Sequence, residues 1–441
     1  MSKKIGMISL GCPKNQVDAE IMLKKLQNGG FEIVNDPLES DIIIVNTCGF
    51  IDDAKTESIE NILDAVSYKD DNEDIKVLVT GCLAQRYQKE IFEEIPEVDG
   101  VIGIGANNDI VDICNKLLDG EKIEEFPKKE DLSIEGERIL TTPPYTAYLK
   151  IAEGCSNHCT YCAIPSIRGE YRSRTSESIL EEAKRLADSG VKELIVVAQD
   201  TTRYGEDLYG KNALVPLLRA ISQIDGIEWI RILYLYPERI TDELIDEIAT
   251  NKKIVKYMDI PVQHCCDRVL KRMNRQGNRE YLTNLFNKIR ERIDGVCLRT
   301  TFIAGFPGET EEEFSELCEF IDEMQFERMG CFAYSEEEGT PAAKMDGMLS
   351  EDERQRRADI VNDMQNEILD KKLESYIGKT FNTIVEGYDS YIDAYYGRTY
   401  MDAPEIDTQI TFTCGYELLE GDIVDVEVIN IVDGELVGET V

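Results

Sequence analysis

The chain has 441 residues, of which 42% are hydrophobic, so its composition is that of a folded globular protein with room for about three domains. It carries 48 Lys and Arg against 87 Asp and Glu, a formal net charge of −39, which disfavours phosphate backbones and favours basic partners. The amino terminus lacks a signal-peptide pattern and no apolar stretch is long enough to span a membrane, which predicts a soluble cytoplasmic protein. Thirteen cysteines in such a chain indicate metal or redox chemistry and not a disulfide framework.

Residues 1–120 alternate between apolar β-branched runs and segments with helical periodicity. Strands are expected at residues 4–10, 41–46 and 76–80, and helices at residues 17–28, 53–68 and 84–95. Short apolar strands that alternate with helices are typical of a parallel sheet buried on both faces. This first domain is therefore predicted to be a doubly wound α/β sheet.

Three cysteines stand just past the predicted strands of this domain. Cys12, Cys48 and Cys82 each lie one to three residues beyond the carboxyl end of a strand and before a helix. Ligands of open α/β sheets bind outside these strand ends, so the three thiols could meet around one metal centre. The alternative is that they are buried free cysteines, which behave as small apolar residues.

A charged segment at residues 121–140 is expected to be a linker, and residues 141–374 form a second alternating domain. Its predicted strands are 145–153, 193–199, 229–234, 257–262, 298–304 and 328–334, and helices are expected at 175–188, 241–250, 279–293, 310–323 and 350–376. The helix at 310–323 begins with a capping box at Thr310. Six such units predict a partial (β/α)6 barrel, whose chemistry lies at the carboxyl ends of the strands.

The first of these strands leads into a loop with three closely spaced thiols. Cys155, Cys159 and Cys162 have the spacing C-x-x-x-C-x-x-C, which lets three sulfurs converge on one soft-metal centre. Closed structural sites use four protein ligands, so three would leave one metal position open to a substrate or cofactor. The alternative is a zinc site completed by His158 or by a distant cysteine.

Polar residues follow other strands of the second domain. Gln199-Asp200, Gln263-His264 and the segment Gly305–Glu309 come at predicted strand ends. No Gly-Lys-Ser/Thr follows the glycines of the last segment, which favours close backbone approach to a ligand over a phosphate loop. Three arginines just past the cysteine loop could bind carboxylates of a cofactor or substrate, or could form a solvated surface: Arg168, Arg172 and Arg174.

Residues 375–441 change to a period of two, which predicts a small β-barrel. Small barrels often bind nucleic acid, but this segment has 14 acidic residues against two basic ones, a net charge of −12. A platform for RNA should be basic, so this domain is expected to prefer a basic protein.

The cysteine loop resembles that of radical S-adenosylmethionine (SAM) enzymes, and the whole chain resembles a methylthiotransferase. Three features together carry the second resemblance: the domain with Cys12, Cys48 and Cys82, the stretch from Glu153 to Gly169, and a terminal barrel similar to a TRAM domain. The resemblance implies that Cys155, Cys159 and Cys162 hold a 4Fe–4S cluster that cleaves SAM to a 5′-deoxyadenosyl radical. It also implies that Cys12, Cys48 and Cys82 hold a second 4Fe–4S cluster, which takes part in delivering the sulfur. One SAM would supply the methyl group and another the radical. Expected SAM contacts are Tyr161, Gln199, Gln263 and Gly305, and no catalytic residue is assigned beyond the cluster ligands.

Three motifs resemble the branch of that family that modifies a protein: Ser9–Asn15, Cys48–Asp52 and Gly397–Asp407. The implied reaction is methylthiolation of the β-carbon of an aspartate in the small-subunit ribosomal protein S-twelve, free or in the ribosome. It would need a sulfur source and a reductant such as flavodoxin or ferredoxin, and the enzyme is expected to be a monomer. The alternatives are the branch that modifies an adenosine in tRNA, which the acidic charge disfavours, and a non-catalytic iron–sulfur carrier or ribosome-associated binding module.

Overall fold

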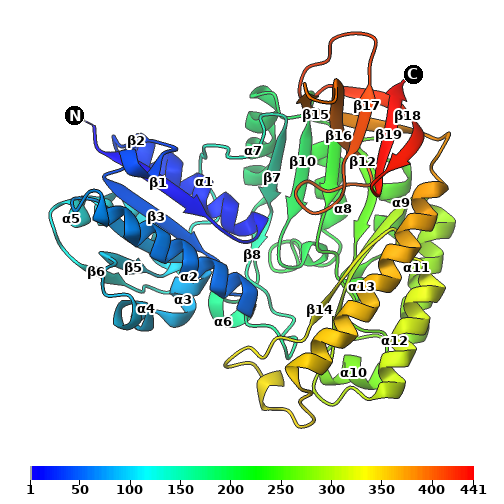
Figure 1. Cartoon of the computed structure of the whole chain (residues 1–441), viewed down its shortest axis with the longest axis horizontal. Coiled ribbons are helices and arrows are strands. Elements are labelled where there is room, and N and C mark those ends of the chain that lie inside the picture. The colour runs from blue at the N-terminus through cyan, green and yellow to red at the C-terminus, as the bar shows by residue number, and fades with distance from the viewer. Residues whose placement is uncertain (1) are drawn as a thin grey trace.

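A computed structural model describes residues 2–441 as three domains that follow one another along the chain (Figure 1). The first, blue to cyan in Figure 1, and the third, orange to red, both pack against the central domain. Among the described residues, every helix is too short or too polar to cross a membrane.

The first domain is a six-stranded parallel sheet with strand order β2-β1-β3-β4-β5-β6. Side chains of β3 and β4 alternate between two hydrophobic clusters: Ile42 and Ile44 pack toward α1 and α5, whereas Ile43 and Val45 pack toward α2 and α3. The doubly wound sheet predicted from the β-branched runs is confirmed. Its elements are β1 (Lys4–Ser9), α1 (Pro13–Asn28), β2 (Glu32–Ile33), β3 (Ile42–Thr47), α2 (Asp52–Ser67), β4 (Lys76–Gly81), α3 (Cys82–Tyr87), α4 (Lys89–Glu94), β5 (Gly100–Ile102), α5 (Ile110–Leu118) and β6 (Ile123–Glu125).

Two details of this domain differ from the sequence pattern. The helix expected at residues 84–95 is two helices, α3 and α4, because Gln88 between them has a left-handed φ of 43°. The segment expected to be a linker begins with β6, which pairs in parallel with β5. Three residues are too few to show a strand periodicity, so β6 could not be recognised beforehand.

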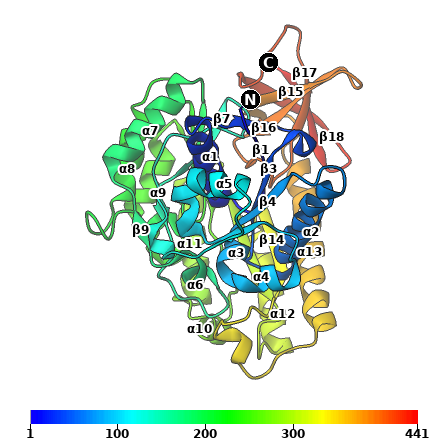
Figure 2. The same cartoon turned by 90° about the vertical axis from the view of Figure 1, so that its left-hand side faces the viewer.

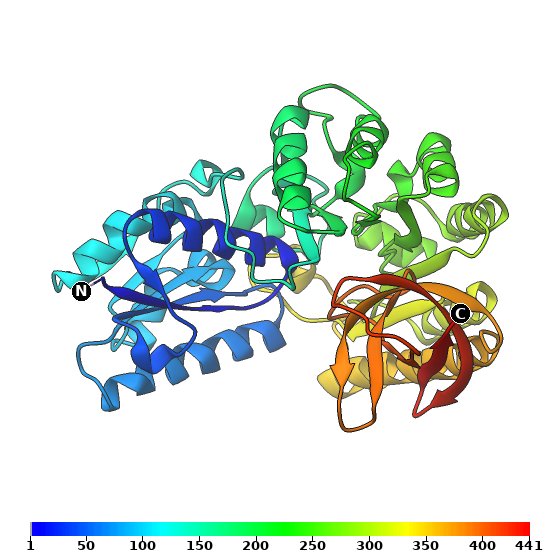
Figure 3. The same ribbon diagram turned by 90° about the horizontal axis from the view of Figure 1, so that it is seen from above.

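The second domain is an open sheet of six parallel strands in the order β14-β13-β12-β11-β10-β7. The helices after each strand cover the outer face of this curved sheet, where most of the apolar core lies (Figure 3). The partial (β/α)6 barrel is confirmed. Its elements are β7 (Thr146–Lys150), β8 (Ala152–Glu153), α6 (Ile164–Arg168), β9 (Arg172–Ser173), α7 (Ser176–Asp188), β10 (Glu193–Val197), α8 (Leu214–Ser222), β11 (Trp229–Ile232), α9 (Asp242–Thr250), β12 (Ile254–Asp259), α10 (Asp267–Arg272), α11 (Arg279–Arg292), β13 (Cys297–Ala304), α12 (Glu311–Met324), β14 (Arg328–Ala333) and α13 (Glu351–Glu374).

The third domain is a closed five-stranded barrel with strand order β15-β16-β17-β19-β18, as predicted. Its strands are β15 (Thr380–Asp389), β16 (Ala394–Thr399), β17 (Ile410–Thr413), β18 (Ile423–Val432) and β19 (Glu435–Thr440). Apolar side chains of this barrel share a hydrophobic cluster with Tyr148, Trp229 and Tyr257 of the central sheet. The terminal barrel therefore covers part of the sheet face that the helices leave open.

Buried ion pairs fix the terminal barrel to the central sheet. Glu193, at the start of β10, has no exposed surface and binds Arg231 of β11 at 2.9 Å and Arg398 of β16 at 2.6 Å. Nearby, Arg328 of β14 binds Asp402 at 2.5 Å. Buried charges are tolerated only when they are paired, so these contacts define how the two domains fit together.

The first domain is fixed to the central domain on two sides. On one side, Lys55 and Arg86 bind Glu337, which lies in the loop after β14, at 3.1 and 2.5 Å. On the other, α3 lies beside α6, the short helix that follows the three-thiol loop (Figure 2). The carboxyl ends of the first domain's strands are thereby directed toward the cysteine loop of the second.

Candidate metal and cofactor site

The three cysteines of the first domain meet at the carboxyl edge of its sheet. Cys48 follows β3 directly, Cys82 follows β4 directly, and Cys12 follows β1 across a Gly11 with a φ of +85°. A Cβ built on Gly11 would lie 2.8 Å from Cys48 Sγ, so this glycine allows the loops of Cys12 and Cys48 to approach each other. Cys12 is the N-cap of α1 and Cys82 is the first residue of α3, where the helix dipole favours a thiolate.

Each of these thiols has another thiol or a cation in its electrostatic surroundings. Burial, with Cys82 and Cys12 close by, raises the pKa of Cys48 to about 12. Burial also raises the pKa of Cys82, against the effect of the nearby Arg168 guanidinium. Burial acts in the same sense on Cys12, but the cations of Lys14 and Arg168 outweigh it and lower the pKa of that thiol. The predicted trio is therefore one cluster of thiols in space.

The second trio lies on the loop after β8. Gly154, with a φ of +73°, starts the loop, and a Cβ there would lie 2.2 Å from the Glu170 carbonyl oxygen. Cys155 is buried, and burial, together with the neighbouring Asp200 and Cys159, raises its pKa to about 11. Cys159 and Cys162 are partly exposed, and Cys159 Sγ lies 4.0 Å from the Tyr236 hydroxyl. The loop thus presents its thiols together, with one side accessible.

A zinc site completed by His158 is not supported. His158 is exposed and has a left-handed φ of 53°. Within residues 2–441, no three His, Cys, Asp or Glu side chains are close enough to hold a single metal ion. A cluster distributes its ligands over several irons, so its thiolates stand farther apart than those of one ion.

The four expected SAM contacts lie at the carboxyl edge of the central sheet. Tyr161 packs on an apolar cluster with Phe306 and Ile303, at the end of β13. Gln263 has a left-handed φ of 71° and its carbonyl accepts from Ile303 N at 2.8 Å. Gln199, after β10, donates to Glu153 at 3.3 Å, while its Oε1 is buried with no partner. An unpartnered buried acceptor beside the cysteine loop suits a cationic ligand group.

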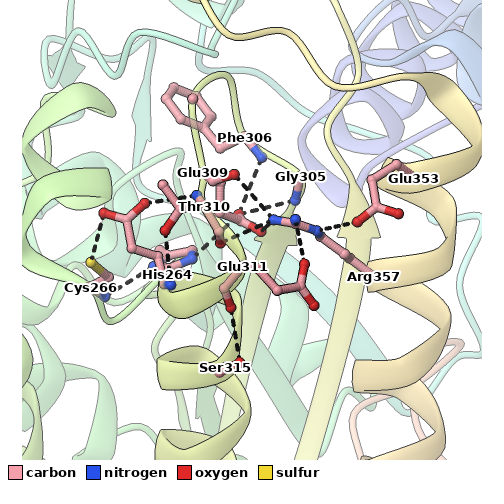
Figure 4. A network of polar contacts seen from close by, with 12 residues as sticks. His264, Cys266, Gly305, Phe306, Glu309, Thr310, Glu311, Ser315, Glu353 and Arg357 are labelled. Atoms are coloured by element: carbon pink, nitrogen blue, oxygen red, sulfur yellow. Dashed lines mark hydrogen bonds and ion pairs between the residues drawn. The ribbon is translucent and has the colours of Figure 1, made fainter.

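Gly305, the fourth residue, belongs to a loop fixed by a buried carboxylate (Figure 4). Glu309 Oε2 accepts from the backbone N–H groups of Gly305 at 3.1 Å and Phe306 at 3.3 Å, and lies 3.4 Å from His264 Nε2. Arg357 of α13 binds the other carboxylate oxygen at 2.8 Å. Burial opposes ionisation of Glu309, but His264 and Arg357 outweigh it and lower its pKa. The Glu309 carboxylate therefore fixes the backbone of this loop in one conformation.

Sequence reasoning missed two residues beside the cysteine loop. The Arg275 guanidinium stacks 3.9 Å from the ring centroid of Tyr236, and its charge acts on Tyr161 and Cys159. Arg275 follows α10, a short helix that the periodicity did not reveal, and Tyr236 follows β11. The preceding strand end is the one signal that could have marked Tyr236.

The arginines after the cysteine loop contact other groups of the protein. Arg168 binds carboxylates of the first and second domains, Arg172 donates to the Glu130 carbonyl at 2.5 Å, and Arg174 binds Glu182 at 2.5 Å. Arg168 and Arg174 are buried, so the expectation of a solvated surface is wrong for these two, whereas Arg172 is partly exposed. Their partners lie elsewhere in the chain, so no local pattern could indicate them.

Comparisons with known proteins agree with this arrangement. The family model "Uncharacterized protein family UPF0004" matches residues 4–103, "Radical SAM superfamily" matches residues 149–321, and "TRAM domain" matches residues 377–441. Among solved structures, the radical S-adenosylmethionine methyltransferase TsrM from Kitasatospora setae has a TM-score of 0.58 at 14% identity, covering 78% of this chain and 77% of that one. At that identity the likeness shows the fold alone.

Curated relatives match over the full length. The protein named "Ribosomal protein uS12 methylthiotransferase RimO" is 51% identical in Clostridium novyi, with 99% of this chain and 97% of the relative covered. Its counterpart in Acetivibrio thermocellus is 48% identical, with 100% and 99% covered, and that in Caldanaerobacter subterraneus is 50% identical, with 99% and 100% covered. With this identity over all three domains, the chain belongs to the RimO family of radical SAM methylthiotransferases.

Proposed function

We propose that this chain attaches a methylthio group to the β-carbon of an aspartate in ribosomal protein uS12. The observation that carries the proposal is the placement of two cysteine trios at facing edges of two domains, bridged by the side chain of Arg168. The full-length relatives, whose printed names state uS12 methylthiotransferase, support the choice of substrate.

Both trios suit a 4Fe–4S cluster by their donor chemistry. The first trio takes one thiol from each of three strand ends and the second takes three from one loop, and Gly11 and Gly154 adopt φ values of +85° and +73° that keep the loops compact. Cys155, Cys159 and Cys162 would hold one cluster, and Cys12, Cys48 and Cys82 the other. With SAM bound at the first, these groups would supply one-electron cleavage of SAM, a methyl group and a route for sulfur.

The chain's own residues would bind and orient SAM. The unpartnered Gln199 Oε1 can accept from an ammonium group. Gln263 and Gly305, at two neighbouring strand ends, would border the ligand with their backbone. Tyr161 offers a ring on the apolar cluster of Phe306, suited to packing against a purine. Glu309 would keep the Gly305 loop in place while SAM enters and leaves.

The terminal barrel supports a basic protein partner over RNA. One of its two basic residues, Arg398, is buried in an ion pair with Glu193, which leaves Lys379 as the exposed one. Eight of its acidic residues are exposed: Asp393, Glu405, Glu417, Glu420, Asp425, Asp433, Glu435 and Glu439. A surface of this sign repels a phosphate backbone and attracts a basic ribosomal protein.

We also infer that the protein works as a cytoplasmic monomer on uS12, free or in the ribosome. Its reductant would be a flavodoxin or ferredoxin, and a separate sulfur source would replenish the sulfur that is transferred.

An assay with two substrates tests the proposal. Protein reconstituted with iron and sulfide under anaerobic conditions is mixed with SAM, reductant and either uS12 or tRNA, with Cys159→Ala as the inactive control. Mass spectrometry is expected to find the methylthio group on an aspartate of uS12. A methylthio group on tRNA alone would establish the adenosine-modifying activity instead, and absence of 5′-deoxyadenosine and of product on both would favour an iron–sulfur carrier or binding module.

A further inference from the structure

The side chain of Arg168 joins the two cysteine trios. Arg168 ends α6, six residues after Cys162, and is 1% exposed. Its guanidinium reaches into the first domain, where Nε donates to Cys82 Sγ at 3.4 Å and one terminal nitrogen donates to Asn15 Oδ1 at 3.0 Å. A residue of the second domain thus donates a hydrogen bond to a thiol of the first.

The other side of this guanidinium faces two carboxylates. It binds Asp18 of α1 at 2.8 Å and Glu153 at 3.1 Å, and Glu153 stands two residues before Cys155. Lys150 of β7 bonds to the same two carboxylates. All four charged side chains are at most 2% exposed. Two other cations lie near the trio: Lys14 acts on Cys12 and stacks 3.5 Å from the ring centroid of Tyr234, and Arg86 donates to the Gly49 carbonyl at 3.0 Å.

A network of this kind costs free energy to bury, because desolvation of several charges is only partly offset by their pairing. An apolar contact between α1 and α6 would hold the domains together at less cost. The orientation of the guanidinium toward a sulfur suggests a role beyond adhesion. Hydrogen bonds and charges at ligand sulfurs are among the features that set the reduction potential of an iron–sulfur cluster.

We propose that Arg168 is a positioning residue that sets the reduction potential of the cluster bound by Cys12, Cys48 and Cys82, while Asp18 limits its effect. The proposal rests on the proposed function, since it requires that second cluster. Reduction adds a negative charge, which a buried guanidinium beside Cys82 stabilises, so Arg168 raises the potential. Asp18 has the opposite charge and lowers it.

The test isolates the second cluster in the full chain. A parent variant with Cys155→Ala, Cys159→Ala and Cys162→Ala is reconstituted, its iron is counted, and the cluster is titrated with dithionite while its absorbance and electron paramagnetic resonance are recorded. Arg168→Gln and Asp18→Asn are added to this parent separately. Arg174→Gln is the matched control, because Arg174 is 2% exposed and paired to Glu182 but donates to no cysteine.

Arg168→Gln is expected to shift the equilibrium at least tenfold toward the oxidised cluster, a fall in potential of about 59 mV for one electron. Asp18→Asn is expected to shift it in the opposite direction, and Arg174→Gln to leave it unchanged. Opposite shifts cannot come from general loosening of the interface, which both substitutions would share.

An intact cluster whose potential is the same in Arg168→Gln, Arg174→Gln and the parent would overturn the inference. Equal shifts in the same direction for Arg168→Gln and Asp18→Asn would also overturn it. If Arg168→Gln does not retain its cluster, Asp18→Asn decides alone: a higher potential supports the inference and an unchanged one refutes it. A parent that binds no iron would instead remove the second cluster from the proposed function, which is a different failure.

Discussion

Replacing Glu193 by Gln should weaken the attachment of the terminal barrel to the central sheet. Glu193 has no exposed surface and lies between Arg231 and Arg398, whose guanidinium groups it neutralises. Burial alone would raise its pKa, but the two arginines lower it from its ordinary value of 4.5 to about 2. At about 1.4 kcal/mol for each pKa unit, that shift corresponds to about 3 kcal/mol of stability. Removing one partner from a buried ion pair costs a similar amount, about 3–5 kcal/mol.

The assay is urea unfolding followed by the fluorescence of Trp229, the one tryptophan of the chain. Trp229 is a suitable reporter because it is 5% exposed and its Nε1 donates to Asn382 of the terminal barrel at 3.3 Å. The Glu193→Gln transition should lose about 3 kcal/mol at neutral pH. As a control, Glu243→Gln removes a half-exposed ion pair to Arg219 and should cost less than about 1 kcal/mol.

The pH dependence gives a second measurement with a defined sign. Because the folded pKa of Glu193 is depressed, its contribution is complete above pH 4.5 and disappears as the pH falls toward about 2. The difference in stability between the unsubstituted protein and Glu193→Gln should therefore shrink across this window. A constant difference, or a loss at neutral pH no larger than that of Glu243→Gln, would refute the view that buried charge fixes this interface.

Three further substitutions test the site. Cys159→Ala should remove about half of the reconstituted iron. The control is Cys331→Ala, at a buried cysteine outside both trios, which should keep its iron. Equal iron contents in the two variants would exclude Cys159 as a ligand. Gly154→Ala should lower iron retention more than Gly190→Ala. Both glycines have a positive φ, but only a Cβ on Gly154 would clash with backbone carbonyls. Equal iron retention in the two variants would show that the close packing at Gly154 does not shape the cysteine loop. Glu337→Gln leaves Arg86 without an ion-pair partner, while Lys55 keeps Asp52 at 2.5 Å, and should cost about 3 kcal/mol. The loss should be seen as faster proteolysis between the first two domains, and unchanged proteolysis would show that this contact does not hold them together.

Strand-end placement was the part of the site that could be predicted from the sequence. Cys12, Cys48 and Cys82 were recognisable because each follows an apolar strand, and parallel strands bring their carboxyl ends to one edge. The capping box at Thr310 was equally visible and is confirmed, since its partner Glu313 lies within the same turn.

What could not be predicted depends on contacts between distant segments. Arg168 bonds to Asp18, 150 residues earlier, and no local pattern encodes such a pairing. The helices α5 and α8 were not predicted; each is nine residues long, and neither N-cap residue, Asp109 or Ala213, makes a side-chain capping hydrogen bond. Short helices of this kind are stabilised mainly by the sheet on which they pack.

The segment Gly397–Asp407 has a consequence for exchanging domains between relatives. Its charged residues Arg398 and Asp402 bind Glu193 and Arg328 of the central sheet, so much of this motif is used for assembly. A chimera that receives the terminal barrel of a tRNA-modifying relative must therefore also receive matching residues at positions 193 and 328. Without matching residues, buried charges at the interface would lose their ion-pair partners. A test of substrate choice by domain swapping would then measure misfolding instead of recognition.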